Sequence, residues 1–255
     1  MDAEILRYRS SLAYNREIFL IEHGSIFKEF STIDENFVEL AKFPQRMRDT
    51  QGESYASMVP FLLLLQRQSR AAFESFAVYQ AYQAWVVLRP GVEALLMIGK
   101  FLDDPKLVGI WQDRREHPAA YRRAFSGKEL RSVGLPASDK IQAVLSKIND
   151  DFVHANVDYF YRHLGMDAGD PVDATILLDY FDKAEFLEAH VLAFLHLLLV
   201  MQGSLSGLFA KLFGVDILLK AQIGPFLKEF GLRIKSSHRG RKRPERFLPI
   251  WDWSS

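Results

Sequence analysis

Apolar residues recur along most of this chain at the three- and four-residue spacing of an amphipathic helix, and no alternating run is long enough to predict a sheet. Helices are expected near residues 3–22, 25–42, 55–102, 138–164, 174–213 and 215–235. Pro90 lies inside the longest stretch, where its missing N–H and its ring predict a kink or a restart. The pattern therefore predicts an all-α fold, a multi-helix bundle of about seven helices with a kinked central helix and a basic C-terminal tail.

Glycine and proline mark the places where helices are expected to end. Gly24 separates the first two helices, and the second is expected to end before Pro44. Residues 117–136 are interpreted as irregular because they contain two prolines and two glycines. Since no repeat or linker divides the chain, we expect one helical domain over residues 1–235 and a basic, aromatic tail over 236–255.

The run from Ala189 to Ala210 contains no Asp, Glu, Lys or Arg and is long enough to cross a bilayer. It does contain His190, His196 and Gln202, and no other segment of the chain has this composition. The central helix of a bundle looks the same in sequence. We interpret the run as buried core and expect no membrane span.

The chain has no cysteine, which excludes disulfides, a thiolate nucleophile and cysteine-based zinc or iron–sulfur sites. No motif predicts a cofactor. The first residues, MDAE, are acidic and lack the basic start and apolar run of a signal peptide. These features favour a cytoplasmic protein.

The formal net charge of zero hides a strongly basic segment. Residues 233–246 hold seven Lys or Arg and one Glu, a local charge of +6, so the rest of the chain sums to −6. Within this segment the candidate phosphate contacts are Arg239, Arg241, Lys242 and Arg243. The tail is therefore the part of the chain that we expect to contact RNA.

A charged pair lies inside an apolar helix. Arg89 and Glu93 are four residues apart and share one helix face, and their neighbours are nearly all apolar. Both are therefore expected to be at least partly buried, where a charge needs a partner. Two interpretations stay open: an ion pair that fixes helix register, or a site in which Arg89 binds an anion such as phosphate and Glu93 holds Arg89 in place.

A second candidate site lies on the predicted helix over 138–164. Asp151, His154 and Asp158 are spaced three and four residues apart on one face, and a carboxylate near an imidazole suits a general base or a metal ligand. The simpler alternative is a polar face in solvent, and a hydrolytic metal centre would need ligands from another helix. If this helix packs beside Arg89 and Glu93, His154 would complete a catalytic cluster.

Two sequence patterns point to a family. Arg233 and His238 are separated by four residues, and the segments LRPGVEALLMIGKFLDDP and INDDFVHANVDYF lie between residues 85 and about 160. The first pattern resembles the Arg-x4–6-His motif of HEPN ribonucleases, in which the His and Arg are thought to act on the RNA 2′-hydroxyl and phosphate. The second resembles uncharacterised bacterial helical proteins distantly related to HEPN. This resemblance implies functional roles for Arg89, Glu93 and His154.

Three functions stay open at this level, and the sequence does not decide whether the protein is an enzyme. The first is a HEPN-like protein that cleaves or binds RNA in a bacterial defence or toxin–antitoxin setting. The second is a non-enzymatic interaction or scaffold protein that forms a homo-oligomer through the 189–210 run or the aromatic C-terminus. The third is a metal-dependent hydrolase built on Asp151, His154 and Asp158.

Overall fold

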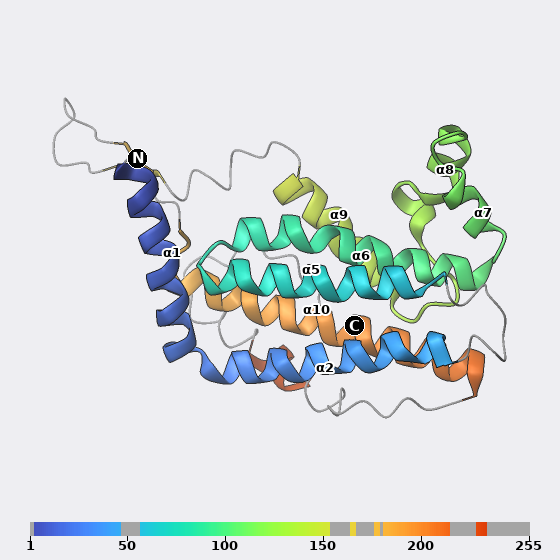
Figure 1. Cartoon of the computed structure of the whole chain (residues 1–255), viewed down its shortest axis with the longest axis horizontal. Helices are drawn as coiled ribbons and strands as arrows, with labels where there is room; N and C mark the ends of the chain where they lie inside the picture. The colour runs from blue at the N-terminus through green and yellow to red at the C-terminus, as the bar shows by residue number, and fades with distance from the viewer. Residues whose placement is uncertain are drawn as a thin grey trace.

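A computed structural model describes residues 3–46, 57–153, 164–166, 176–178, 181–214 and 228–233 of the chain. Four helices lie alongside one another and form the body of the molecule (Figure 1). They are α2 (Gly24–Arg46), α5 (Val59–Ala77), α6 (Ala81–Asp103) and α10 (Ala184–Phe213). The predicted all-α bundle is confirmed. The described strands are two segments of three residues, β1 (Leu164–Met166) and β2 (Ile176–Leu178), which pair antiparallel.

Other helices lie at the two ends of the body (Figure 1). At one end α1 (Ala3–Glu22) crosses the turn between α5 and α6, and at the other end α7 (Leu107–Gln112) and α8 (Pro118–Phe125) project from the bundle. A 3-10 turn, η1 (Gly127–Leu130), leads from α8 toward α9 (Ser138–Ile148), which packs against α6.

Helix α10 supplies the centre of the core. Its side chains from Leu187 to Phe209 are almost all buried, and His190 and Gln202 form hydrogen bonds with neighbouring helices. Gln202, for example, accepts a hydrogen bond of 3.3 Å from Asn36 and donates one to the carbonyl of Ile33. Among the described residues, the stretch Phe186–Phe213 is apolar and long enough to cross a membrane, but 83% of its most apolar window is buried inside the protein. This burial agrees with the interpretation of the run as core.

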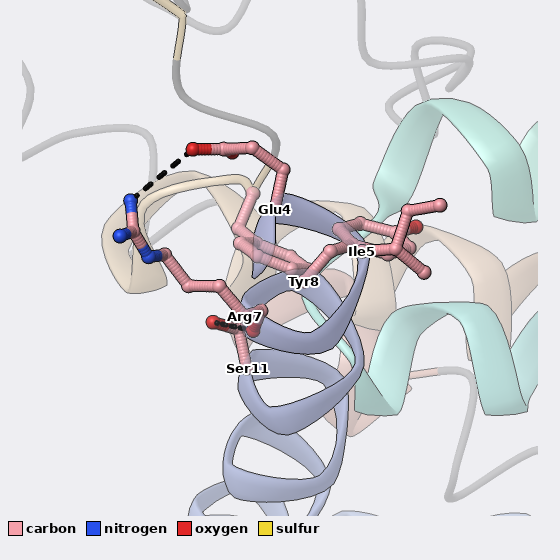
Figure 2. Close-up of a pocket in the computed structure, with 6 residues that line it drawn as sticks. Glu4, Ile5, Arg7, Tyr8 and Ser11 are labelled. Atoms are coloured by element: carbon pink, nitrogen blue, oxygen red, sulfur yellow. Dashed lines mark hydrogen bonds and ion pairs between the residues drawn. The ribbon is translucent and has the colours of Figure 1, made fainter. Parts of the chain in front are cut away.

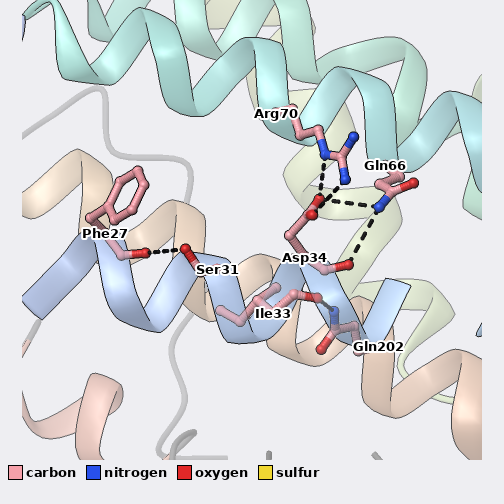
Figure 3. Close-up of polar contacts among 7 residues, drawn as sticks. All are labelled: Phe27, Ser31, Ile33, Asp34, Gln66, Arg70 and Gln202. Carbon is pink, nitrogen blue, oxygen red and sulfur yellow. Dashed lines mark hydrogen bonds and ion pairs between the residues drawn. The ribbon is translucent and has the colours of Figure 1, made fainter. Parts of the chain in front are cut away.

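Helices α2 and α5 are joined by a charged contact as well as by apolar packing (Figure 3). Arg70 donates to both carboxylate oxygens of Asp34, at 2.8 and 2.7 Å, and Gln66 donates to Asp34 Oδ1 at 3.2 Å. The hydrogen bond to the Asp34 carboxylate is the main reason that the pKa of Arg70 is raised. Asp34 thereby fixes the register of the two helices at the surface of the core.

The prediction of one long helical stretch over 55–102 is wrong in one respect. The segment forms two helices, α5 and α6, that meet at a sharp turn. Tyr79 adopts a left-handed conformation (φ 62°) between α5 and α6. The segment before α10 closes the turn: the amide of Asp182 donates to the carbonyl of Tyr79 at 2.8 Å, and the carboxylate of Asp182 accepts from the amide of Ala81 at 2.7 Å. Asp182 thus satisfies a free N–H at the start of α6 from a distant part of the chain.

The helix end expected before Pro44 and the restart expected at Pro90 do not occur. Helix α2 continues past Pro44 to Arg46, and α6 runs unbroken through Pro90. Gly91 follows Pro90 at a close contact with α5, where an added Cβ would lie 3.3 Å from Leu65. This tertiary packing outweighs the loss of one backbone hydrogen bond.

Two further predictions are corrected. Residues 117–136 are not wholly irregular, because α8 begins at Pro118, in the first-turn position where a proline costs nothing. The helix predicted over 138–164 changes at Ile148 to a π-helical turn, η2 (Asn149–Val153), and Leu164 lies in β1. The apolar residues Ile141, Leu145, Ile148 and Phe152 have the spacing of an α-helix, so the sequence pattern did not reveal the π-helical turn.

Candidate functional site

Arg89 and Glu93 form the predicted pair on α6, and the structure adds a third residue. The guanidinium donates from Nη2 to Glu93 Oε1 at 2.7 Å and from Nε to Asn149 Oδ1 at 2.5 Å. The side chains of Arg89 and Glu93 are 32% and 31% exposed, so both are partly buried, as expected. Arg89 therefore links α6 to the first residue of η2, and its Nη1 has no partner among the described residues.

Partial burial affects the acidity of Glu93 in this pair. Burial raises the pKa of the Glu93 carboxyl, and the nearby Arg89 opposes the shift. The ion pair is thus partly desolvated, and each partner depends on the other. This arrangement fits the interpretation that the pair fixes helix packing, and it leaves one edge of the guanidinium for an anion.

The π-helical turn that carries Asn149 is held on both sides. Phe152 is fully buried and packs against Tyr82 and Trp85 of α6, with ring centroids 5.9 and 6.3 Å apart. On the outer side Lys147 pairs with Asp151 across one turn. π-Helical turns occur often at functional sites because they redirect side chains within a helix.

The remaining residues of the predicted cluster are only partly tested. His154 and Asp158 lie outside the described residues, so their position relative to Arg89 stays a prediction. Asp151, the described member of the weak metal set, is engaged by Lys147. Within the described part of the chain no group of three His, Asp or Glu side chains is arranged to hold a metal ion.

The basic segment 233–246 lies almost entirely outside the described residues, including His238, Arg239, Arg241, Lys242 and Arg243. Its first residue, Arg233, is described. Arg233 donates to Glu29 of α2 at 3.0 Å and lies 5.3 Å from the ring centroid of Phe230. Burial raises the pKa of Glu29, and the nearby Arg233 opposes that shift. The arginine of the Arg-x4-His pattern thus joins this segment to the body.

A basic surface that the sequence analysis missed lies on the projecting helices. Residues 106–131 hold seven Lys or Arg and three Asp or Glu, a local charge of +4, and we call this segment the basic arm. Arg114 is fixed over the ring of Trp111 at 4.3 Å, and Arg131 pairs with Asp139. The exposed cations of the arm that have no ion-pair partner among the described residues are Lys106, Arg115, Arg122, Arg123 and Lys128. The signal was present in the sequence as a local charge imbalance, although the segment 233–246 is more basic.

Aromatic packing holds the basic arm in place. Trp111 contacts Phe61 of α5 at 5.0 Å between ring centroids, and Phe125 of α8 contacts Phe101 of α6 at 5.9 Å. Below these rings Asp103, at the end of α6, accepts hydrogen bonds of 2.8 Å from two consecutive amides, those of Val133 and Gly134. The arm is thereby a positioned surface with its cations facing outward.

A shallow pocket of about 440 Å³ lies at the opposite end of the molecule (Figure 2). It is formed by the first turns of α1 together with Phe181, which stacks on Tyr8 with centroids 5.7 Å apart. The ion pair of Glu4 and Arg7 at its edge is largely exposed. None of the residues predicted for the site lines this pocket.

Searches of protein-family models, of curated proteins and of solved structures found no match to this chain.

Proposed function

We propose that this protein binds RNA through the basic arm. The observation that supports the proposal is a set of exposed cations that have no ion-pair partner among the described residues and that aromatic packing holds on one projection of the molecule. Arg115, Arg122 and Arg123 lie on or beside α8, where no described carboxylate pairs with them. Such cations neutralise phosphates and release counterions, which is the main source of affinity for nucleic acids.

Planar side chains among these cations favour a single-stranded nucleic acid over a simple anion. His117 is exposed and Tyr121 is half-buried, and each lies one or two positions from an arginine pair. Unpaired bases stack on such side chains and on guanidinium groups. The charge of the whole chain supports this proposal, because the basic arm and residues 233–246 together carry +10 and the rest of the chain carries −10. An acidic body directs a polyanion to the two basic segments.

Cleavage of the bound RNA is the second part of the proposal, and the HEPN resemblance supports it. In this scheme Nη1 of Arg89, which has no partner among the described residues, contacts a phosphate, while Glu93 and Asn149 hold the guanidinium in position. His154, one residue beyond η2, would act as the general base on the 2′-hydroxyl. A catalytic role for His154 is tested separately from binding, because His154→Ala is expected to abolish cleavage and to leave RNA affinity unchanged.

The binding test is a titration of a fluorescent single-stranded RNA of 20 nucleotides with the full-length protein, followed by anisotropy at several salt concentrations. Arg122→Gln/Arg123→Gln is expected to reduce the salt dependence by about 1.4 in slope, since each phosphate contact to a single strand contributes about 0.7. The matched control, Lys28→Gln/Lys211→Gln, removes two exposed cations from α2 and α10 and should change the slope much less.

Two results would refute RNA binding by the basic arm. One is wild-type protein that does not bind RNA at low salt. The other is an arm variant whose affinity and salt slope equal those of the Lys28→Gln/Lys211→Gln control. A DNA strand of the same sequence and a duplex RNA serve as comparison ligands, and a preference for either of them would contradict the proposed single-stranded RNA partner.

A further inference from the structure

The outer side of α1 is apolar although it faces solvent. Of the α1 side chains only Phe19 is buried in the bundle. Leu6, Tyr14, Leu20 and Ile21 are 47%, 64%, 45% and 72% exposed. The helix runs across the end of the bundle, so one long side of it stays clear of the body (Figure 1).

These residues lie on one side of the helix, and Ser10 and Glu17 lie between them on the same side. Leu6, Ala13 and Leu20 are spaced seven residues apart, and Tyr14 and Ile21 repeat at the same spacing beside them. Residues seven apart lie on one helix face with a drift of only about 20°. A helix at the surface of a lone molecule presents polar residues to water, whereas α1 presents an apolar stripe there. We call this stripe the α1 outer face.

We propose that two copies of this chain pair through the α1 outer face, with the two α1 helices antiparallel. Ser10 and Ala13 lie at the middle of the helix and are small, so two backbones can approach closely where they cross. Antiparallel pairing about this point places Leu6 of one copy near Leu20 of the other. The crossing is self-complementary, as a twofold interface requires.

Two charges, one at the edge of the α1 outer face and one within it, favour the antiparallel orientation. Arg9 precedes the crossing point and Glu17 follows it, and both are exposed with no ion-pair partner among the described residues. In antiparallel pairing the Arg9 of each copy lies at the level of the partner's Glu17. A parallel pair would set Arg9 against Arg9 and Glu17 against Glu17. Opposed helix dipoles favour the same orientation.

One of the two interfaces that the sequence offered is not available, and the other, the aromatic C-terminus, lies outside the described residues. The 189–210 run, which the sequence offered as an oligomer interface, is buried within the body of a single chain. An interface through it would require the bundle to open. The α1 outer face needs no rearrangement, because its apolar side chains are already exposed.

The test is sedimentation velocity of the full-length protein over a hundredfold range of concentration. Wild type is expected to shift from monomer to dimer with concentration. Leu6→Glu/Leu20→Glu should sediment as a monomer throughout, whereas Leu63→Glu, which changes a 52% exposed leucine on α5, should dimerise as wild type does. Circular dichroism before each run establishes that the variants are folded.

A charge exchange tests the orientation. Arg9→Glu and Glu17→Arg alone are each expected to weaken dimerisation by about tenfold, and the double variant Arg9→Glu/Glu17→Arg should restore it, because opposite charges face each other again. A wild-type protein that stays monomeric, or a folded Leu6→Glu/Leu20→Glu variant that still dimerises, overturns the interface. Failure of the double variant to regain affinity overturns the antiparallel arrangement.

Discussion

The indole N–H of Trp85 donates a hydrogen bond of 2.9 Å to Nδ1 of His190, and both side chains are completely buried. The bond joins α6 to α10 across the centre of the bundle, between residues 105 positions apart. Because an indole nitrogen is only a donor, Nδ1 of this imidazole is the acceptor and Nε2 carries the proton. A polar pair at this depth specifies which faces of the two helices meet.

Replacement of Trp85 by Phe is expected to lower the free energy of unfolding by about 2–3 kcal/mol. The variant removes the donor to a buried acceptor and also leaves space beside Phe76 and Phe194. Urea unfolding measures the change. Trp111→Phe is the matched control, because Trp111 is only partly buried, and a loss in the control as large as that of Trp85→Phe would contradict the role of the hydrogen bond.

Gly99 packs closely against the segment that follows η1. A Cβ there would lie 2.6 Å from Ser132 Oγ and 2.7 Å from Ser132 Cβ. Gly99→Ala is therefore expected to destabilise the protein by about 1–3 kcal/mol, measured by thermal or urea unfolding. Gly109→Ala on α7 is the control, since a Cβ there meets nothing within 4 Å and alanine favours a helix. Equal stability of the two variants would show that the contact at Gly99 is not tight.

The sequence predicted the features that depend on local pattern. The helix over 3–22 has the expected bounds, and the 189–210 run is buried, because periodicity and composition report directly on helix length and burial. The break between α5 and α6 was not predicted, since Tyr79 carries no local turn signal. Its left-handed conformation is held by Asp182, which is about 100 residues away.

The same limit applies to the candidate site. Arg89 and Glu93 could be paired from sequence because they are four residues apart on one helix. Asn149 could not be added, since the contact depends on how α6 packs against α9 and on the π-helical turn at that residue. Sequence spacing identified the contact of Arg89 with Glu93, whereas the contact of Arg89 with Asn149 depends on helix packing.

The Asp34–Arg70 pair is expected to couple more strongly than a fully exposed pair. Asp34 is 16% exposed and accepts two hydrogen bonds from one guanidinium (Figure 3). A double-mutant cycle of Asp34→Asn and Arg70→Gln should give about 1 kcal/mol, reduced by solvent screening at Arg70. The Arg131–Asp139 pair, with both side chains more than half exposed, should give less than about 0.5 kcal/mol in the same cycle. Couplings of equal size would contradict this comparison.

Arg89 is expected to stabilise the contact between α6 and the π-helical turn whether or not it also binds an anion. Arg89→Met keeps most of the apolar stem and removes the donors to Glu93 and Asn149, with an expected loss of about 1–2 kcal/mol in urea unfolding. Arg16→Met on α1 breaks a pair with Glu74 in which both side chains are more than half exposed, and should cost less than about 0.5 kcal/mol. Matching losses would mean that Arg89 does not stabilise the helix contact.

Stability is expected to fall between pH 7.5 and pH 5 because of a buried histidine on α10. Burial lowers the pKa of His196 from its ordinary value of 6.5 to about 4. The folded-state pKa is below the unfolded value, so the unfolded chain binds the proton first as the pH falls. The contribution of neutral His196 to the free energy of unfolding is complete above the unfolded-state pKa of 6.5 and is lost as the pH falls toward the folded-state pKa of about 4. The total loss is about 3 kcal/mol, because each pKa unit corresponds to about 1.4 kcal/mol.

His196→Gln separates this effect from the titration of other groups. Glutamine stays neutral over the whole range, so the variant should lose less stability than wild type between pH 7.5 and pH 5, measured by urea unfolding at each pH. His117→Gln is the control, because it makes the same replacement at an exposed position at the start of α8. Equal losses of stability in His196→Gln and wild type over this interval would contradict this role of His196. The pH dependence would then arise from another residue.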